Sequence, residues 1–131
     1  MTQLRIAEAP LRRDLATPAL RAFFNITDRW GLGNEQERVL LGNPGRSTFF
    51  RWKGAGDGAI GADVLERISY ILGIYKALHI LYGDELADEW PSLPNSNAIF
   101  AGTTPLAYML SGGLLAMQTV RRLLDARRGG L

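Results

Sequence analysis

Few side chains in this sequence have the chemistry of a catalytic centre. There is no cysteine among the 131 residues, which excludes thiolate catalysis, thiolate metal sites and disulfides. His79 is the only histidine, and it falls on the apolar side of an expected helix. That position favours a histidine held in a core or interface over a general base. The residues therefore offer no obvious nucleophile with a base beside it.

Carboxylates at helical spacing are the other candidate for chemistry. Asp84 and Asp88, and likewise Glu85 and Glu89, stand four residues apart, as in some metal sites. No second imidazole or carboxylate cluster completes a ligand set, so we expect a solvated face or a docking patch. The glycine-rich stretch 54–61 lacks the Gly-Lys-Ser/Thr ending of a phosphate loop. The sequence predicts a protein that is not an enzyme and has no metal, cofactor or small-molecule substrate.

The stretch RSTFFRWK, residues 46–53, has the chemistry of a DNA-reading helix. Phe49 and Trp52 are three residues apart and fit a packing face. Arginine can bridge guanine O6 and N7, serine can bond bases or phosphate, and a phenyl ring can contact a thymine methyl. Lys53 is better suited to a phosphate. The candidate DNA-binding residues are Arg46, Ser47, Thr48, Phe50, Arg51 and Lys53; the alternative is a helical hairpin with solvated arginines.

A second basic cluster lies at the end of the sequence, where the last arginines precede Gly129-Gly130. Guanidinium groups there can pair with carboxylates or enter a phosphate pocket of a partner. Cations and glycine also end ordinary surface helices, because they complement the helix dipole and cap the last turn. Helix physics alone favours this second interpretation.

Composition sets the wider limits. The length fits one domain, or two small ones sharing a core, and the 47% hydrophobic content fits a folded protein. The net charge of +2 and pI of about 9.3 support nucleic-acid binding only weakly. The start of the sequence is too polar for a signal peptide, and the apolar run 68–82 is too short to span a membrane. We expect a cytoplasmic protein without membrane contact.

All the strong periodic signals are helical. Thr17-Pro18 predicts a helix start and Gly31 its end; Asn34 and Glu37 resemble a capping box that opens the next helix. The glycine-rich turn 42–45 precedes the helix 46–53, and a long helix is expected over 62–82. Its apolar residues form two stripes, so it is either a central core helix or a homodimer face, and the spacing leaves both open.

The end of the chain predicts further helices. A short helical piece is expected over 84–90. Thr104-Pro105 repeats the helix-start signal, Gly112-Gly113 ends that helix, and a last helix follows over 114–128.

The segment 95–130 resembles the C-terminal toxin-binding segment of the Xre/MbcA/ParS antitoxins. The stretch 46–53 is similar to the recognition helix of Xre-type helix-turn-helix proteins, with Phe49 and Phe50 in its leucine and tyrosine places. The resemblance runs from Gln36 onward and includes the linking helix, but the turn at Asn43-Pro44-Gly45 departs from the usual pattern. The positions that match the C-terminal pattern in order are Asn95 or Asn97, Phe100, Gly102, Thr104, Pro105, Leu106, Met109, Gly112, Val120, Arg121, Leu124, Arg128, Gly129 and Gly130.

This resemblance implies an all-α fold, with a helix-turn-helix region over 1–60 and a linking helix with a C-terminal toxin-binding domain over 61–131. It implies a homodimer that binds operator DNA, represses its own operon and covers the active site of a RES-class, NAD-consuming toxin. The alternatives are a free-standing helix-turn-helix regulator with a dimerising C-terminal domain, and an adaptor that no longer binds DNA. The implied toxin-binding residues are Arg121, Arg122, Asp125, Arg127, Arg128, Gly129, Gly130 and Leu131.

Overall fold

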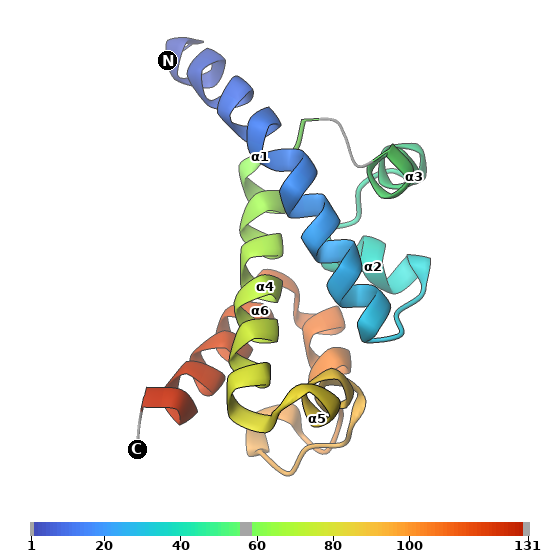
Figure 1. The fold of residues 1–131 in the computed structure, drawn as a ribbon, viewed down its shortest axis with the longest axis vertical. Coiled ribbons are helices and arrows are strands. Elements are labelled where there is room, and N and C mark those ends of the chain that lie inside the picture. Colours follow the sequence, from blue (N-terminus) through green and yellow to red (C-terminus); the bar gives the residue numbers. More distant parts are fainter. Residues whose placement is uncertain (1, 56–58, 130–131) are drawn as a thin grey trace.

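The fold is built from helices alone in the part of the chain that the computed structural model describes, residues 2–55 and 59–129 (Figure 1). The side chains of the first helix are described from residue 16 onward. The elements are α1 (Thr2–Arg29), α2 (Asn34–Leu40), α3 (Arg46–Ala55), α4 (Ala62–Tyr82), α5 (Asp84–Glu89), the short 3-10 turns η1 (Trp90–Ser92) and η2 (Ala98–Phe100), and α6 (Pro105–Gly129). The predicted all-α fold is confirmed.

Helix α4 is the centre of the molecule and packs against α1, α5 and α6. Ile68, Ile71, Ile74 and Leu78 are fully buried at helical spacing and form its core face. They belong to one hydrophobic cluster that extends from α1 to the last turns of α6. Of the two roles that the sequence leaves open for this helix, that of a central core helix is present within a single chain, and the α2–α3 and C-terminal regions share one core.

Helix α1 begins much earlier than the sequence signals predict. Thr17-Pro18 was expected to start it, yet the helix begins at Thr2 and continues through Pro18. Pro18 is exposed, while Ala16 and Leu20 on either side of it are buried in the core. Packing on both sides of the proline outweighs the one backbone hydrogen bond that it cannot donate.

Helix α6 is two helical segments joined at a kink. Gly113 has φ 66° and ψ −143°, a conformation that glycine adopts without steric cost. The hydroxyl of Thr104 accepts a 3.0 Å hydrogen bond from the Ala107 N–H, so it caps the first segment as predicted. The expected break near Gly112-Gly113 is confirmed, and it turns the second segment across α4.

The two regions with candidate binding residues lie on opposite sides of α4 (Figure 1). Helices α2 and α3 stand beside α1 on one side, and the C-terminal turns of α6 project on the other. A partner bound to one region would therefore leave the other region accessible.

Candidate DNA-binding and partner-binding surfaces

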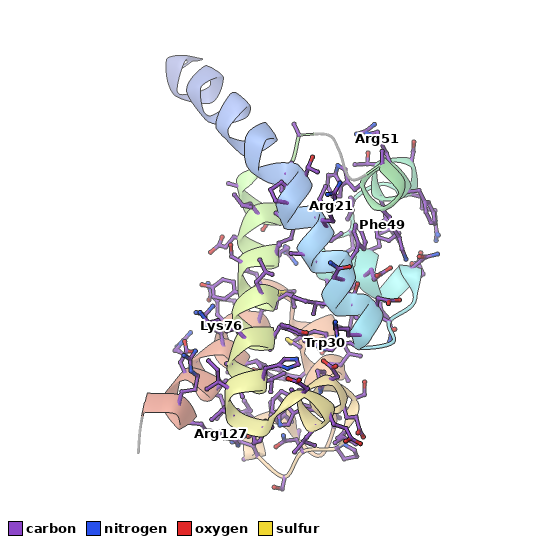
Figure 2. The ribbon with its side chains drawn as sticks, in the orientation of Figure 1. Arg21, Trp30, Phe49, Arg51, Lys76 and Arg127 are labelled. Carbon is purple, nitrogen blue, oxygen red and sulfur yellow. The ribbon has the colours of Figure 1, made fainter. Side chains whose placement is uncertain are left out.

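Helix α3 has one buried and one exposed face, as its sequence predicts. Phe49 and Trp52 are 1% and 5% exposed, and the Phe49 ring meets Phe24 of α1 edge to face at 5.8 Å between centroids. Figure 2 shows Phe49 between α3 and α1 and Arg51 on the far side of α3. The predicted outward residues are exposed and Thr48 is half-buried; the exposed ones are Arg46, Ser47, Phe50, Arg51 and Lys53.

The turn between α2 and α3 is held by its own backbone and by Arg38. Gly42 and Asn43 both have positive φ, 93° and 61°. The Arg38 guanidinium donates a 2.9 Å hydrogen bond to the Pro44 carbonyl. These features fix a compact helix–turn–helix despite the unusual turn sequence.

A buried polar network that the sequence analysis missed joins α1, α2 and α3. Glu37 is 2% exposed and accepts hydrogen bonds from the Thr27 hydroxyl and from the Lys53 ammonium, the latter at 2.6 Å. Lys53 also donates to the Asn34 side-chain oxygen at 2.7 Å. A buried carboxylate is tolerated only when paired in this way, so the network fixes α3 against its two neighbours.

The predicted capping box at Asn34 and Glu37 is wrong. Gly33 is the N-cap residue of α2, and its N–H donates a 3.1 Å hydrogen bond to the Gln36 side chain. Glu37 lies on the same face of α2 as Leu40, three residues on, and is buried with it. The three-residue spacing from Leu40 is the sequence signal that could have predicted the burial of Glu37.

Arg46, at the start of α3, is paired at the surface. Its guanidinium lies 2.8 Å from Glu35, which Arg38 also contacts. The Arg38 hydrogen bond, helped by the charges of Arg38 and Arg46, holds the pKa of Glu35 below its ordinary value. The pair is exposed, so a DNA phosphate or base could displace Glu35 at small cost.

The C-terminal arginines are also held, but by exposed partners. Arg121 donates to Asp125 at 3.0 Å and lies against Gly73 of α4, where an added Cβ would collide with its guanidinium. Arg128 lies 3.9 Å from the same carboxylate. Asp125 thus holds two guanidinium groups close together.

A cavity of about 450 Å³ brings together four of the predicted toxin-binding residues, Arg121, Asp125, Arg128 and Gly129. Arg127 points elsewhere and donates a 2.7 Å hydrogen bond to the Tyr82 hydroxyl. Arg122 is exposed and outside the cavity lining. The predicted Gly130 and Leu131 lie outside the described residues.

His79 lies at the junction of α1, α4 and α5. Its Nδ1 is 2.9 Å from Asp84 and its Nε2 is 3.1 Å from Asp88, while the Tyr75 ring packs on it at 4.2 Å. Arg29 of α1 reaches Asp88 at 3.9 Å. Both ring nitrogens face carboxylates, so His79 has the geometry of a structural junction with no free nitrogen for base catalysis.

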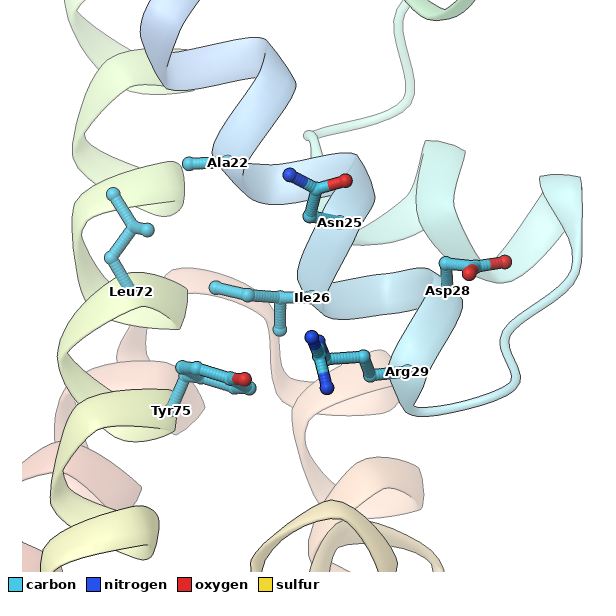
Figure 3. Close-up of a pocket in the computed structure, with 7 residues that line it drawn as sticks. All are labelled: Ala22, Asn25, Ile26, Asp28, Arg29, Leu72 and Tyr75. Carbon is cyan, nitrogen blue, oxygen red and sulfur yellow. The ribbon is translucent and has the colours of Figure 1, made fainter. Parts of the chain in front are cut away.

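A cavity of about 660 Å³ lies between α1 and α4 (Figure 3). Ala22, Ile26 and Leu72 provide apolar walls. The Arg29 side chain reaches toward Tyr75, and the Asp28 side chain points away from both of them. The lining contains no nucleophile with an adjacent base, so its chemistry does not indicate an active site.

Comparison with known sequences identifies the helix-turn-helix region. The profile of the antitoxin Xre-like helix-turn-helix domain matches residues 9–73, which include α2 and α3 and extend into α4. Residues 9–73 belong to the Xre-like helix-turn-helix domain family of antitoxins. It is also 47% identical over 132 residues to the uncharacterized protein y4oB of Sinorhizobium fredii (strain NBRC 101917 / NGR234), covering 99% of this chain and 100% of that protein.

The family assignment bears on two predictions. This antitoxin family is regulatory and not enzymatic, which confirms that the protein is not an enzyme. An Xre-like antitoxin domain implies a toxin partner and DNA binding. Separately, none of the helices in the described residues has the length and apolarity needed to cross a membrane.

Proposed function

We propose that this protein is the antitoxin of a type II toxin–antitoxin pair whose toxin is a RES-class, NAD-consuming enzyme. In this proposal α3 binds operator DNA and represses the antitoxin's own operon, and the end of α6 covers the active-site entrance of the toxin. Both activities take place in the cytoplasm. The observation that carries the proposal is the placement of two basic surfaces on opposite sides of one shared core.

The DNA-binding half of the proposal is supported by the two faces of α3. Its aromatic residues anchor the helix, and its outer face presents Ser47, Phe50 and Arg51, which suit base edges and thymine methyl groups. Arg46 and Thr48 lie at the margins of this outer face, and their side chains suit contacts with the DNA backbone. Two such helices in a homodimer would meet successive major grooves, so the proposed operator is palindromic.

The toxin-binding half is supported by the sequence resemblance of the C-terminal segment and by its chemistry. Asp125 holds Arg121 and Arg128 as a pair of guanidinium groups beside an open cavity. Such a pair suits the carboxylates or the phosphate pocket of an enzyme that binds NAD. Gly129 also lines this cavity, and Arg122 is an exposed arginine on the same helix.

The first test is capture of the toxin by the antitoxin. The protein is co-expressed with the product of the adjacent gene and pulled down, alongside a chain truncated after Asp125. The proposal predicts capture by the full chain and loss of capture by the truncated chain. If both folded chains fail to capture the product, the free-standing helix-turn-helix regulator becomes the better account.

A further inference from the structure

A small cavity lies where the end of α3 meets α1. It has a volume of about 240 Å³, below the range of typical small-molecule pockets, and is large enough for a single anionic group. Its lining is contributed by both helices and consists of Arg21, Phe24, Asn25, Trp52, Lys53, Gly54 and Ala55. No acidic side chain is among these residues.

The two positive charges at this cavity are not equally available to an anion. The Lys53 ammonium is bonded to the buried Glu37 and to Asn34, so its charge is already balanced inside the protein. Arg21 is exposed, and among the described residues no ion pair involves it. Asn25 adds an exposed amide that can donate a hydrogen bond. The cavity therefore presents one exposed guanidinium and one neutral donor.

The position of the cavity identifies the anion. Helix α3 has ten residues and is about 15 Å long, while the major groove is about 12 Å wide. A helix that places its outer face on base edges therefore brings its ends close to the two phosphate backbones. Arg21 lines the cavity together with Trp52 and Lys53, so it lies on the side of α1 that faces α3 (Figure 2).

We propose that Arg21 and Asn25 bind a phosphodiester of the DNA backbone at the α1–α3 cavity, and that Lys53 positions α3 without contacting phosphate. The proposal rests on operator binding by α3 and extends that surface from one helix to two. It replaces Lys53 with Arg21 as the phosphate contact at this end of α3. Phosphate contacts position a protein on DNA without reading its sequence.

The test measures binding of a fluorescent duplex carrying the region upstream of this protein's own gene, and of a scrambled duplex, over a series of salt concentrations. Arg21→Gln removes the charge, Arg21→Lys keeps it, and Lys76→Gln removes an equal charge from the opposite side of α4 (Figure 2). Circular dichroism checks that each variant is folded.

Arg21→Gln is expected to weaken binding to both duplexes by about tenfold. It should also reduce the slope of log affinity against log salt by about 0.9, the value for one phosphate contact. Arg21→Lys should keep the wild-type slope. If Arg21→Gln behaves like Lys76→Gln while the wild type binds the upstream duplex, the phosphate site is wrong and the proposed function stands. If the wild type binds neither duplex, the phosphate site and the DNA-binding half of the proposed function are both wrong.

Discussion

The α3 surface and the C-terminal surface of α6 both present arginines, but they are held in different ways. Helix α3 is fixed by buried groups: the Phe49 and Trp52 rings, and a lysine–glutamate pair whose carboxylate is 2% exposed. The last turns of α6 bury Val120 and Leu124, and the exposed Asp125 arranges Arg121 and Arg128. The difference teaches that the geometry of α3 is built into the core, whereas that of Arg121 and Arg128 depends on solvent-exposed ion pairs.

The largest expected effect is a loss of stability when a side chain on the buried face of α3 is truncated. Phe49→Ala should lower the free energy of unfolding by about 3–5 kcal/mol, because it removes a buried ring that packs against α1. Leu115→Ala on α6 is the matched control, since that side chain is 74% exposed and its loss should cost less than about 0.5 kcal/mol. Urea unfolding measures both. Equal losses would mean that the two regions are not held differently.

The buried pair should give the next largest effect. Lys53→Met leaves the Glu37 carboxylate buried without its cation. It should lower the free energy of unfolding by about 2–3 kcal/mol, less than is usual for breaking a fully buried pair, because Lys53 is partly exposed. The double variant Lys53→Met with Glu37→Met removes both charges and should recover most of that loss in urea unfolding. A single variant as stable as the wild type would show that the network does not hold α3.

Gly73→Ala should separate stability from partner binding on the other surface. The added methyl displaces the Arg121 guanidinium, while alanine favours the helix by up to about 1 kcal/mol, so stability should change little. Capture of the toxin should weaken by about tenfold, because Arg121 leaves its place beside Asp125. Binding curves for the toxin are compared with those of Ser69→Ala, an exposed position one turn away. Unchanged capture would exclude a role for the arranged arginine pair.

The smallest effect concerns pH and the exposed pair at the start of α3. The pKa of Glu35 is lowered from its ordinary value of 4.5, so its pairing adds stability above that pH. The contribution is lost as the pH falls through the lower, folded-state pKa. Glu35→Gln should therefore be slightly less stable than the wild type near neutral pH and equal to it in acid. Thermal melts of both proteins near neutral pH and in acid test this prediction. A stability difference between the variant and the wild type that grows in acid would contradict it.

Local signals in the sequence were sufficient for much of the fold. The three-residue spacing of Phe49 and Trp52 predicted the buried face of α3, and Thr104-Pro105 predicted the capped start of α6. Both signals act within one or two helical turns, where residue type and backbone geometry decide the outcome. The boundaries of α4 followed from the same kind of local pattern.

The features that the sequence did not predict depend on distant residues. Glu37 can be buried only because Lys53 and Thr27 reach it from other helices. Arg121 lies against Gly73, and Arg127 bonds Tyr82 from 45 residues away. The α1–α3 cavity likewise exists only when the two helices are packed, so no local rule could have pointed to Arg21.

The central claim is that two separate surfaces serve two partners, and one measurement on a single variant tests it most directly. Arg51→Glu places a negative charge at the centre of the exposed face of α3. One preparation of this variant is assayed for binding to the upstream duplex and for capture of the toxin. The account predicts loss of DNA binding with toxin capture equal to that of the wild type. Loss of both activities in a folded protein would contradict it.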